Sequence, residues 1–136
     1  MGPVNWIAVP LAAFMAGAVA FLWYGPLFGR AKLEEVGPGR LAGRRSPART
    51  IAITAISILV SSAMLGHAYA RIGPETLAAK PWLYWMQSGG LAGAFVIPAL
   101  LVSYTHMKVS TRLAMIDCGY WLTAYLAMGT TYWLLG

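Results

Sequence analysis

The sequence predicts an all-α, polytopic membrane protein in which four transmembrane helices form one compact bundle. Composition is the first reason: 59% of the 136 residues are hydrophobic and only 10% are charged, whereas a soluble domain carries about 25% charged residues. A chain so short and so poor in charge cannot cover its apolar side chains with polar surface. The second reason is that the charged residues cluster and leave four apolar stretches, each reaching the roughly 20 residues that a spanning helix needs.

Helix boundaries follow from these stretches and from local signals. Ser46 and Pro47 indicate a helix start, because serine caps an N-terminus and proline fits the first helical position. Ser110 or Thr111 can cap the last helix, and Pro98 should kink the third. We expect a single domain over residues 1–136, with helices near residues 4–28, 47–70, 81–105 and 111–135 and a basic cytoplasmic loop over residues 29–46.

The basic residues predict the orientation of the chain. Two of the ten, Arg71 and Lys80, lie in one loop. The other eight lie on the opposite side: Arg30, Lys32, Arg40, Arg44, Arg45, Arg49, Lys108 and Arg112. Cytoplasmic loops carry the excess of Lys and Arg, so both termini should be extracytoplasmic. The net charge of +6 then indicates contact with anionic membrane lipid, and we expect no nucleic-acid partner.

Small residues at helical spacing predict where helices pack. The pairs are Ala13/Gly17, Ser62/Gly66 and Gly89/Gly93. Such pairs let helix backbones approach closely in lipid, and we expect homo-oligomers with faces such as the first or third pair in contact. A polar stripe along the second helix predicts a side that faces protein: Thr50, Thr54, Ser57 and Ser61.

Asp117 is the only acidic residue within a predicted span. At a helix centre it would cost on the order of 2.5–3.5 kcal/mol. It lies roughly 6 Å from the helix start, however, where the positive end of the helix dipole favours an anion. Tyr120 and Trp121 follow three and four residues later and therefore share its helix face.

The first span brings further polar groups to the same depth. Trp23 and Tyr24 lie about as far from the cytoplasmic boundary as Asp117 does, and His106 lies at the inner end of the third span. We expect the carboxylate to accept a hydrogen bond, with Tyr24, Trp23 and Arg30 as the leading donors, because an unpaired anion in apolar surroundings is costly. An intramembrane ionisable residue suggests a functional site; the alternative is a structural lock between helices.

Other polar residues suggest little chemistry. Asn5, His67 and Gln87 can form a second polar cluster at the outer end, although each is also explained as a helix-end or interfacial group. The sequence holds no zinc-protease, paired-cysteine or Ser-His-Asp motif and no carboxylate pair within the spans. We therefore expect no metal site, no cofactor and no enzyme activity.

Three blocks of sequence resemble a known family. They are Asn5-Trp6, Trp23-Tyr24-Gly25-Pro26-Leu27-Phe28-Gly29-Arg30 and Asp117-x-Gly119-Tyr120-Trp121. This pattern is similar to that of the bacterial family called domain of unknown function 1761, over essentially the whole chain. The resemblance implies a four-helix protein of the bacterial inner membrane with no known activity. Where the family pattern has lysine after Phe-Gly, this chain has Arg30, which keeps the charge but leaves a lysine-specific role unassigned.

Two functions remain open. The first is a homo-oligomeric inner-membrane module that binds or passes a small solute or lipid ligand, with Asp117, Tyr24 and His106 at its inner mouth. The second is a structural or accessory membrane protein that stabilises partners or responds to lipid. A carboxylate reached by water would favour the first function, and a dry, fully hydrogen-bonded carboxylate would favour the second.

Overall fold

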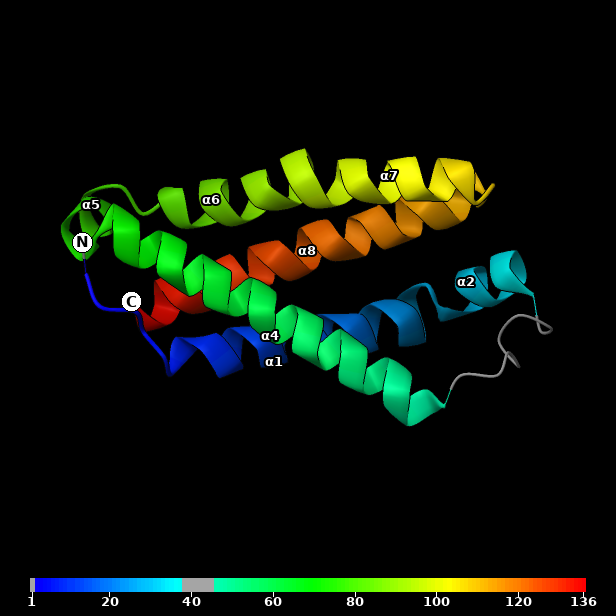
Figure 1. The fold of residues 1–136 in the computed structure, drawn as a ribbon, viewed down its shortest axis with the longest axis horizontal. Coiled ribbons are helices and arrows are strands. Elements are labelled where there is room, and N and C mark those ends of the chain that lie inside the picture. The colour runs from blue at the N-terminus through cyan, green and yellow to red at the C-terminus, as the bar shows by residue number, and fades with distance from the viewer. Residues whose placement is uncertain (1, 38–45) are drawn as a thin grey trace.

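The computed structural model describes residues 2–37 and 46–136, and over these ranges it contains helices and no strand. The elements are α1 Ala8–Leu22, η1 Trp23–Leu27, α2 Gly29–Val36, α4 Pro47–Ile72, α5 Pro74–Ala79, α6 Leu83–Leu91, η2 Ala92–Val96, α7 Ile97–His106 and α8 Thr111–Leu135. These residues form four long rods: α1 with η1, then α4, then α6–η2–α7, then α8 (Figure 1). Both ends of the chain lie at the same end of the bundle. The predicted basic loop begins with α2, and residues 38–45 lie outside the described residues.

Three of the rods are long and apolar enough to cross a membrane. They are Ala8–Leu27, Pro47–Ile72 and Leu83–His106. Helix α8 has 25 residues, or about 38 Å at the usual helical rise, so its length suffices. It falls outside the apolar set because its many Tyr, Trp, Thr and Gly residues lower its mean hydropathy. Of the four predicted spans, three are therefore supported by length and apolar composition.

Helix α8 is the centre of the bundle. It packs along α1 and α6 and also contacts α2, α4 and α7. Ala8, Ala12 and Ala16, spaced by four residues, are fully buried in the core, and these small side chains let α1 and α8 approach closely. Gly129 serves the contact with α6, because a Cβ there would lie 2.9 Å from the Tyr84 carbonyl oxygen. The one long helix outside the apolar set is thus the most enclosed one.

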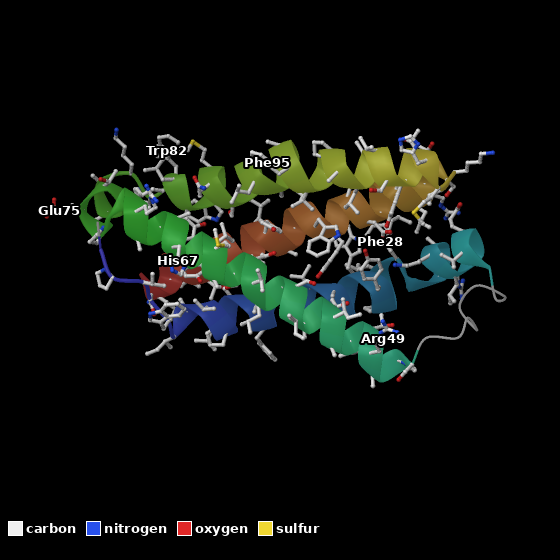
Figure 2. All side chains as sticks on the ribbon, viewed as in Figure 1. Phe28, Arg49, His67, Glu75, Trp82 and Phe95 are labelled. Carbon is white, nitrogen blue, oxygen red and sulfur yellow. The ribbon has the colours of Figure 1, made fainter. Side chains whose placement is uncertain are left out.

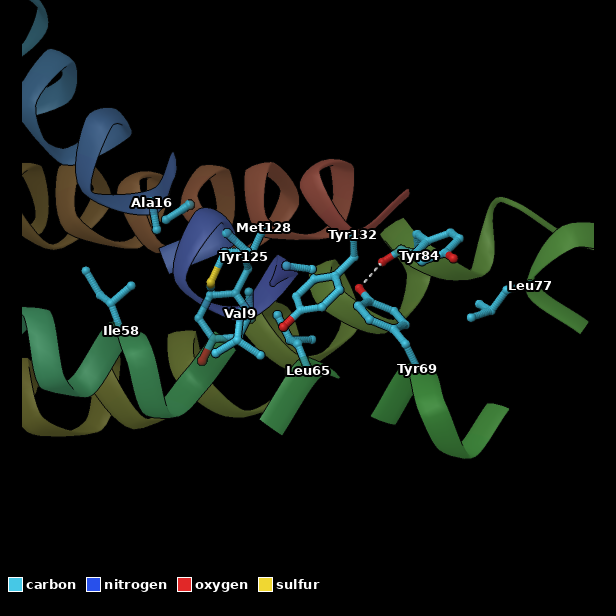
Figure 3. Packing of buried hydrophobic residues seen from close by; sticks show 14 of the residues in the cluster. Val9, Ala16, Ile58, Leu65, Tyr69, Leu77, Tyr84, Tyr125, Met128 and Tyr132 are labelled. Atoms are coloured by element: carbon cyan, nitrogen blue, oxygen red, sulfur yellow. Dashed lines mark hydrogen bonds between the residues drawn. The ribbon is translucent and has the colours of Figure 1, made fainter. Parts of the chain in front are cut away.

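A layer of tyrosines closes the bundle at the end that holds both termini. The rings of Tyr69 and Tyr84 lie 4.9 Å apart between centroids, and those of Tyr69 and Tyr132 lie 5.1 Å apart (Figure 3). The Tyr69 hydroxyl donates to the Tyr84 carbonyl at 2.7 Å, and the Tyr132 hydroxyl donates to the Ser62 carbonyl at 2.8 Å. A Cβ at Gly66 would lie 2.8 Å from the Tyr132 hydroxyl oxygen. The predicted Ser62/Gly66 pair therefore serves a contact within the chain.

The two π-helical turns lie beside prolines. Pro26 lies inside η1, where the Phe28 amide donates to the Trp23 carbonyl at 2.8 Å across five residues. Pro98 lies just after η2, which contains the carbonyl of Ala94. A proline lacks the amide of its turn and its ring crowds the carbonyl four residues earlier. A wider turn accommodates that crowding, so the third rod continues through Pro98.

The prediction that the polar stripe on the second helix faces protein is wrong for Thr50, Thr54 and Ser57. Thr50, Thr54 and Ser57 are exposed and do not face protein among the described residues, because all of residues 47–57 are exposed. Helix α4 packs against the bundle through its C-terminal half, where Ser62 is buried and donates to the Val9 carbonyl at 2.8 Å. The Thr54 hydroxyl instead donates to the Thr50 carbonyl of its own helix at 2.9 Å.

Candidate functional site

Four elements meet around one carboxylate at the end of the bundle opposite the termini. Asp117 lies in the second turn of α8 and is buried. The Tyr24 hydroxyl from η1 donates to Oδ1 at 2.6 Å, and the Tyr104 hydroxyl from α7 donates to Oδ2 at 2.6 Å. Bonds of this length from a hydroxyl to a carboxylate are short and charge-assisted. Each carboxylate oxygen therefore ties α8 to a different rod.

Lys32 of α2 completes the contact with a positive charge. Its Nζ lies 3.5 Å from Asp117 Oδ1 and 4.0 Å from the centroid of the Tyr24 ring. The ammonium thus contacts both a carboxylate and the face of an aromatic ring, each of which attracts a cation. The Lys32 side chain is 34% exposed and the Asp117 side chain 7%. The buried anion is paired with a cation that reaches the protein surface.

Aromatic side chains pack closely around this polar group. Trp23 donates from Nε1 to the Ile116 carbonyl at 3.0 Å. Its ring lies against Gly119, where a Cβ would come within 2.9 Å of the ring. Tyr120 lies 5.2 Å from the Tyr24 ring between centroids, and its hydroxyl donates to the Ala16 carbonyl at 3.4 Å. The glycine in the Asp117-x-Gly119 block is therefore required by the approach of the indole.

The sequence identified some of the donors correctly and missed others. The predicted hydrogen bond from Tyr24 to Asp117 is present, whereas Trp23 bonds the carbonyl next to Asp117. Arg30 is exposed and makes no bond to Asp117 within the described residues. Lys32, two residues later, takes that place because residues two apart on a helix face different directions.

His106 was the wrong residue on the third rod. It is exposed at the end of α7, and Tyr104, two residues earlier, reaches the carboxylate instead. Trp121 lies beside the site, with its ring 5.1 Å from that of Tyr120 between centroids. The depth of the third rod was predicted correctly, but its rotation about its own axis was not.

An exposed ionic contact holds α2 against the start of α8. Arg112 donates to Glu34 at 3.3 Å and to Glu35 at 3.4 Å. The Ser110 hydroxyl donates to Glu35 and accepts the Leu113 amide at 3.2 Å, as an N-cap does. Sequence reasoning missed this contact, although Glu34 and Glu35 are the only acidic residues of the basic loop. Through it, α2 is positioned so that Lys32 faces Asp117.

The residues of the predicted outer cluster make separate bonds. Asn5 accepts the Ala8 amide at 3.1 Å and donates to the Leu135 carbonyl at 3.1 Å, which joins the ends of α1 and α8. His67 bonds the Ala63 carbonyl of its own helix at 2.9 Å through Nδ1. Gln87 makes no side-chain hydrogen bond with the residues that the structure describes. Hydrogen bonding does not unite the three in one site.

The arrangement at Asp117 suits a role in holding helices together better than a role in catalysis. The carboxylate receives two hydroxyls and an ammonium, so its acceptor sites face protein groups. A surface hollow of about 290 Å³ nearby is lined by Trp23, Arg112 and Ile116, among others, and not by Asp117. Over residues 2–37 and 46–136, no three His, Cys, Asp or Glu side chains gather where a metal ion could bind.

Comparison with known proteins gives a family and no function. No curated protein and no solved structure matches the chain. A family model described as protein of unknown function (DUF1761) matches residues 7–132, a range that contains both the Trp23-Tyr24 block and the Asp117 block. The chain therefore belongs to the DUF1761 family of proteins of unknown function.

Proposed function

We propose that this protein is a four-span inner-membrane protein that acts as a structural or accessory module without catalysis, and that Asp117 locks its helices together. One observation carries the proposal: both oxygens of a buried carboxylate are bonded by hydroxyls from two other rods, and a lysine from a third element pairs with it. A site that binds solute needs free polar groups directed at the solute, whereas here the protein itself uses them.

The surface supports a place in the membrane. Large apolar side chains are exposed along the rods, including Phe14 and Phe21 of α1, Ile51 and Ile56 of α4, and Phe95 of η2. Soluble monomers rarely expose contiguous apolar patches beyond a few hundred Å². Both chain ends lie at one end of the bundle (Figure 1), which supports an even number of crossings with α8 as the fourth span.

The charges support the orientation. Arg30, Lys32, Arg49, Lys108 and Arg112 lie at or next to the rod ends opposite the termini. The excess of basic residues marks the cytoplasmic side, so both termini are extracytoplasmic in this proposal. Reporter fusions at Gly136 test it: activity of a periplasmic reporter is the expected result, and a cytoplasmic signal contradicts the orientation.

The single cysteine provides a test of the lock. Cys118 is buried directly beside Asp117, so its reaction with a hydrophilic thiosulfonate reagent reports whether water reaches this layer. We expect slow labelling in the parent, faster labelling in Asp117→Ala and an intermediate rate in Asp117→Asn. Rapid labelling of the folded parent contradicts a dry lock and favours solute handling.

A homo-oligomeric module that binds or passes a small solute is the second candidate. A cavity of about 390 Å³ at the outer end is lined in part by Tyr69, Tyr84, Tyr132 and Asn5, and cavities of about 300–1,000 Å³ are typical of small-molecule sites. This candidate requires more than one copy, in contact through faces such as Ala13/Gly17 or Gly89/Gly93. Mass measurement in nanodiscs tests it, and a monomer only would count against it.

A further inference from the structure

A large apolar groove lies between α1 and the free half of α4. Its volume is about 1040 Å³. The lining combines small residues with large apolar ones: Pro10, Ala13, Phe14, Gly17, Ala18, Ala20, Phe21, Leu22, Thr50, Ile51, Thr54, Ala55, Ile58 and Leu59. The two threonines are its only polar residues, and the Thr54 hydroxyl is already bonded to its own helix. The groove therefore suits hydrocarbon.

Among residues 2–37 and 46–136, no side chain fills this groove. Ala13 and Gly17 remove side-chain volume from the α1 wall, and a Cβ at Gly17 would meet no heavy atom within 4 Å. On the other wall, residues 47–57 of α4 are exposed throughout. The space exceeds most sites for small polar ligands and opens toward the lipid-facing surface.

Positive charge without an acidic partner among the described residues lies at the cytoplasmic end of the groove. Arg49 directly precedes Thr50, the first α4 residue of the lining, and is exposed at the end of the rod (Figure 2). The chain has four acidic side chains, all within the described residues. Within the described residues, three of them pair with other basic residues: Asp117 with Lys32, and the loop residues Glu34 and Glu35 with Arg112. The fourth, Glu75, belongs to α5 at the opposite end of the bundle.

The start of α4 adds a second attraction for an anion. Its N-cap, Ser46, makes no side-chain capping bond, and the first turn contains no acidic residue. The first amides of a helix lack acceptors within the helix, and its N-terminus carries partial positive charge. Phosphate groups bind at such ends. Apolar walls, an arginine and the N-terminus of a helix thus follow one another along the same groove.

We propose that the groove between α1 and α4 binds one anionic phospholipid, with its acyl chains along the apolar walls and its phosphate at Arg49 and the first turn of α4. The proposal needs the membrane insertion proposed above but not the Asp117 lock. Basic pockets between helices on the cytoplasmic side bind anionic headgroups in this way. A second copy of the chain in the groove would bring Arg49 toward another strongly basic surface, whereas a phosphate neutralises it.

Two variants with matched controls test the two halves of the site. Arg49→Gln removes the headgroup contact, and Arg71→Gln makes the same change at the other end of the same helix. Gly17→Leu fills the groove, and Gly90→Leu adds the same side chain at an exposed glycine of α6 that also has open space around it. Neither glycine substitution meets a clash at Cβ, so all four variants should fold.

The measurement is native mass spectrometry of the full chain, released from vesicles of equal dioleoyl-phosphatidylglycerol and dioleoyl-phosphatidylcholine. We expect the parent to retain phosphatidylglycerol about fivefold over phosphatidylcholine, as one arginine contact would give. Arg49→Gln should abolish this preference while Arg71→Gln keeps it, and Gly17→Leu should lose both lipids while Gly90→Leu keeps them.

Several outcomes would overturn the proposal. They are equal retention of both lipids by the parent, equal behaviour of a variant and its control, or a dimer without lipid that Gly17→Leu separates. Protection of Cys118 in the same samples shows whether the lock still holds when the lipid site fails. If alkaline carbonate extracts the parent from membranes, the proposed membrane function and the lipid site both fail.

Discussion

The two ends of the bundle both contain hydrogen-bonded tyrosine hydroxyls, but the acceptors differ. At the end that holds both termini, Tyr69 and Tyr132 donate to backbone carbonyls. At the opposite end, Tyr24 and Tyr104 donate to the side chain of Asp117. A helix carbonyl keeps its bond within the helix when an extra donor is removed, whereas a single substitution of Asp117 removes the acceptor of both hydroxyls. The end that contains Asp117 should therefore be the more sensitive to single substitutions.

The largest effect is expected from Asp117→Ala. It leaves two hydroxyls and an ammonium without their acceptor, and breaking such a buried arrangement should lower the free energy of unfolding by about 3 kcal/mol. Unfolding in mixed detergent micelles measures it. Asp117→Asn keeps the shape and one acceptor oxygen and should lose less. An alanine variant as stable as the parent would refute the lock.

A matched pair of tyrosines compares the two ends directly. Tyr104→Phe leaves a buried carboxylate oxygen unpaired and should cost about 2 kcal/mol, since bonds to charged groups are worth more than neutral ones. Tyr132→Phe removes a donor from a helix carbonyl and should cost about 1 kcal/mol. Both keep the aromatic ring, and the same unfolding assay applies. Equal losses would show that the two ends do not differ as the hydrogen bonds indicate.

Gly119 sharpens the comparison through packing. Gly119→Ala puts a methyl group 2.9 Å from the Trp23 ring, whose indole is held by its bond to the Ile116 carbonyl. The overpacked contact should cost about 1–2 kcal/mol. Gly90→Ala, with open space at Cβ, should instead be neutral or stabilise by up to about 1 kcal/mol. Destabilisation by both variants would point to general sensitivity of these helices.

The smallest effect is expected at Lys32. Its ammonium lies at the longer distance of 3.5 Å and its side chain is partly exposed, so Lys32→Gln should cost only about 0.5 kcal/mol at low salt. Salt screens such pairs. The difference between parent and variant should therefore shrink as sodium chloride is raised in the unfolding assay. A loss as large as that of Asp117→Ala would make Lys32 the main partner of the carboxylate.

Depth along a helix could be read from the sequence, but rotation about the helix axis could not. Counting from the cytoplasmic boundary placed Tyr24 level with Asp117, and the two are bonded. Arg30 and His106 were proposed because they lie near the same boundary, but the contacts belong to Lys32 and Tyr104, each two residues away. Rotation depends on neighbouring helices and on the π turns, which a regular helical pattern does not contain.

The apolar stretches predicted all four long helices, but they did not distinguish the central one. Only the three rods that expose apolar residues are apolar enough to cross a membrane, and α8, which packs against them, is not. A central helix can hold Tyr, Thr and Gly because neighbouring helices supply hydrogen bonds and need close approach. The Thr50 and Thr54 stripe failed for the opposite reason: those residues lie on a half-helix that leaves the bundle and borders a groove. Polarity alone does not distinguish a helix side that faces protein from one that borders an open groove.

The central place of α8 has a consequence for biogenesis. Residues 24 and 117 are separated by 93 positions, and the helix that joins the other three is the last to leave the ribosome. Until then, Tyr24 and Tyr104 lack their acceptor and the alanine face of α1 lacks the helix it packs against. The first three rods are thus an unfinished intermediate, and a ribosome stalled before residue 111 would leave a chain suited to removal by proteases.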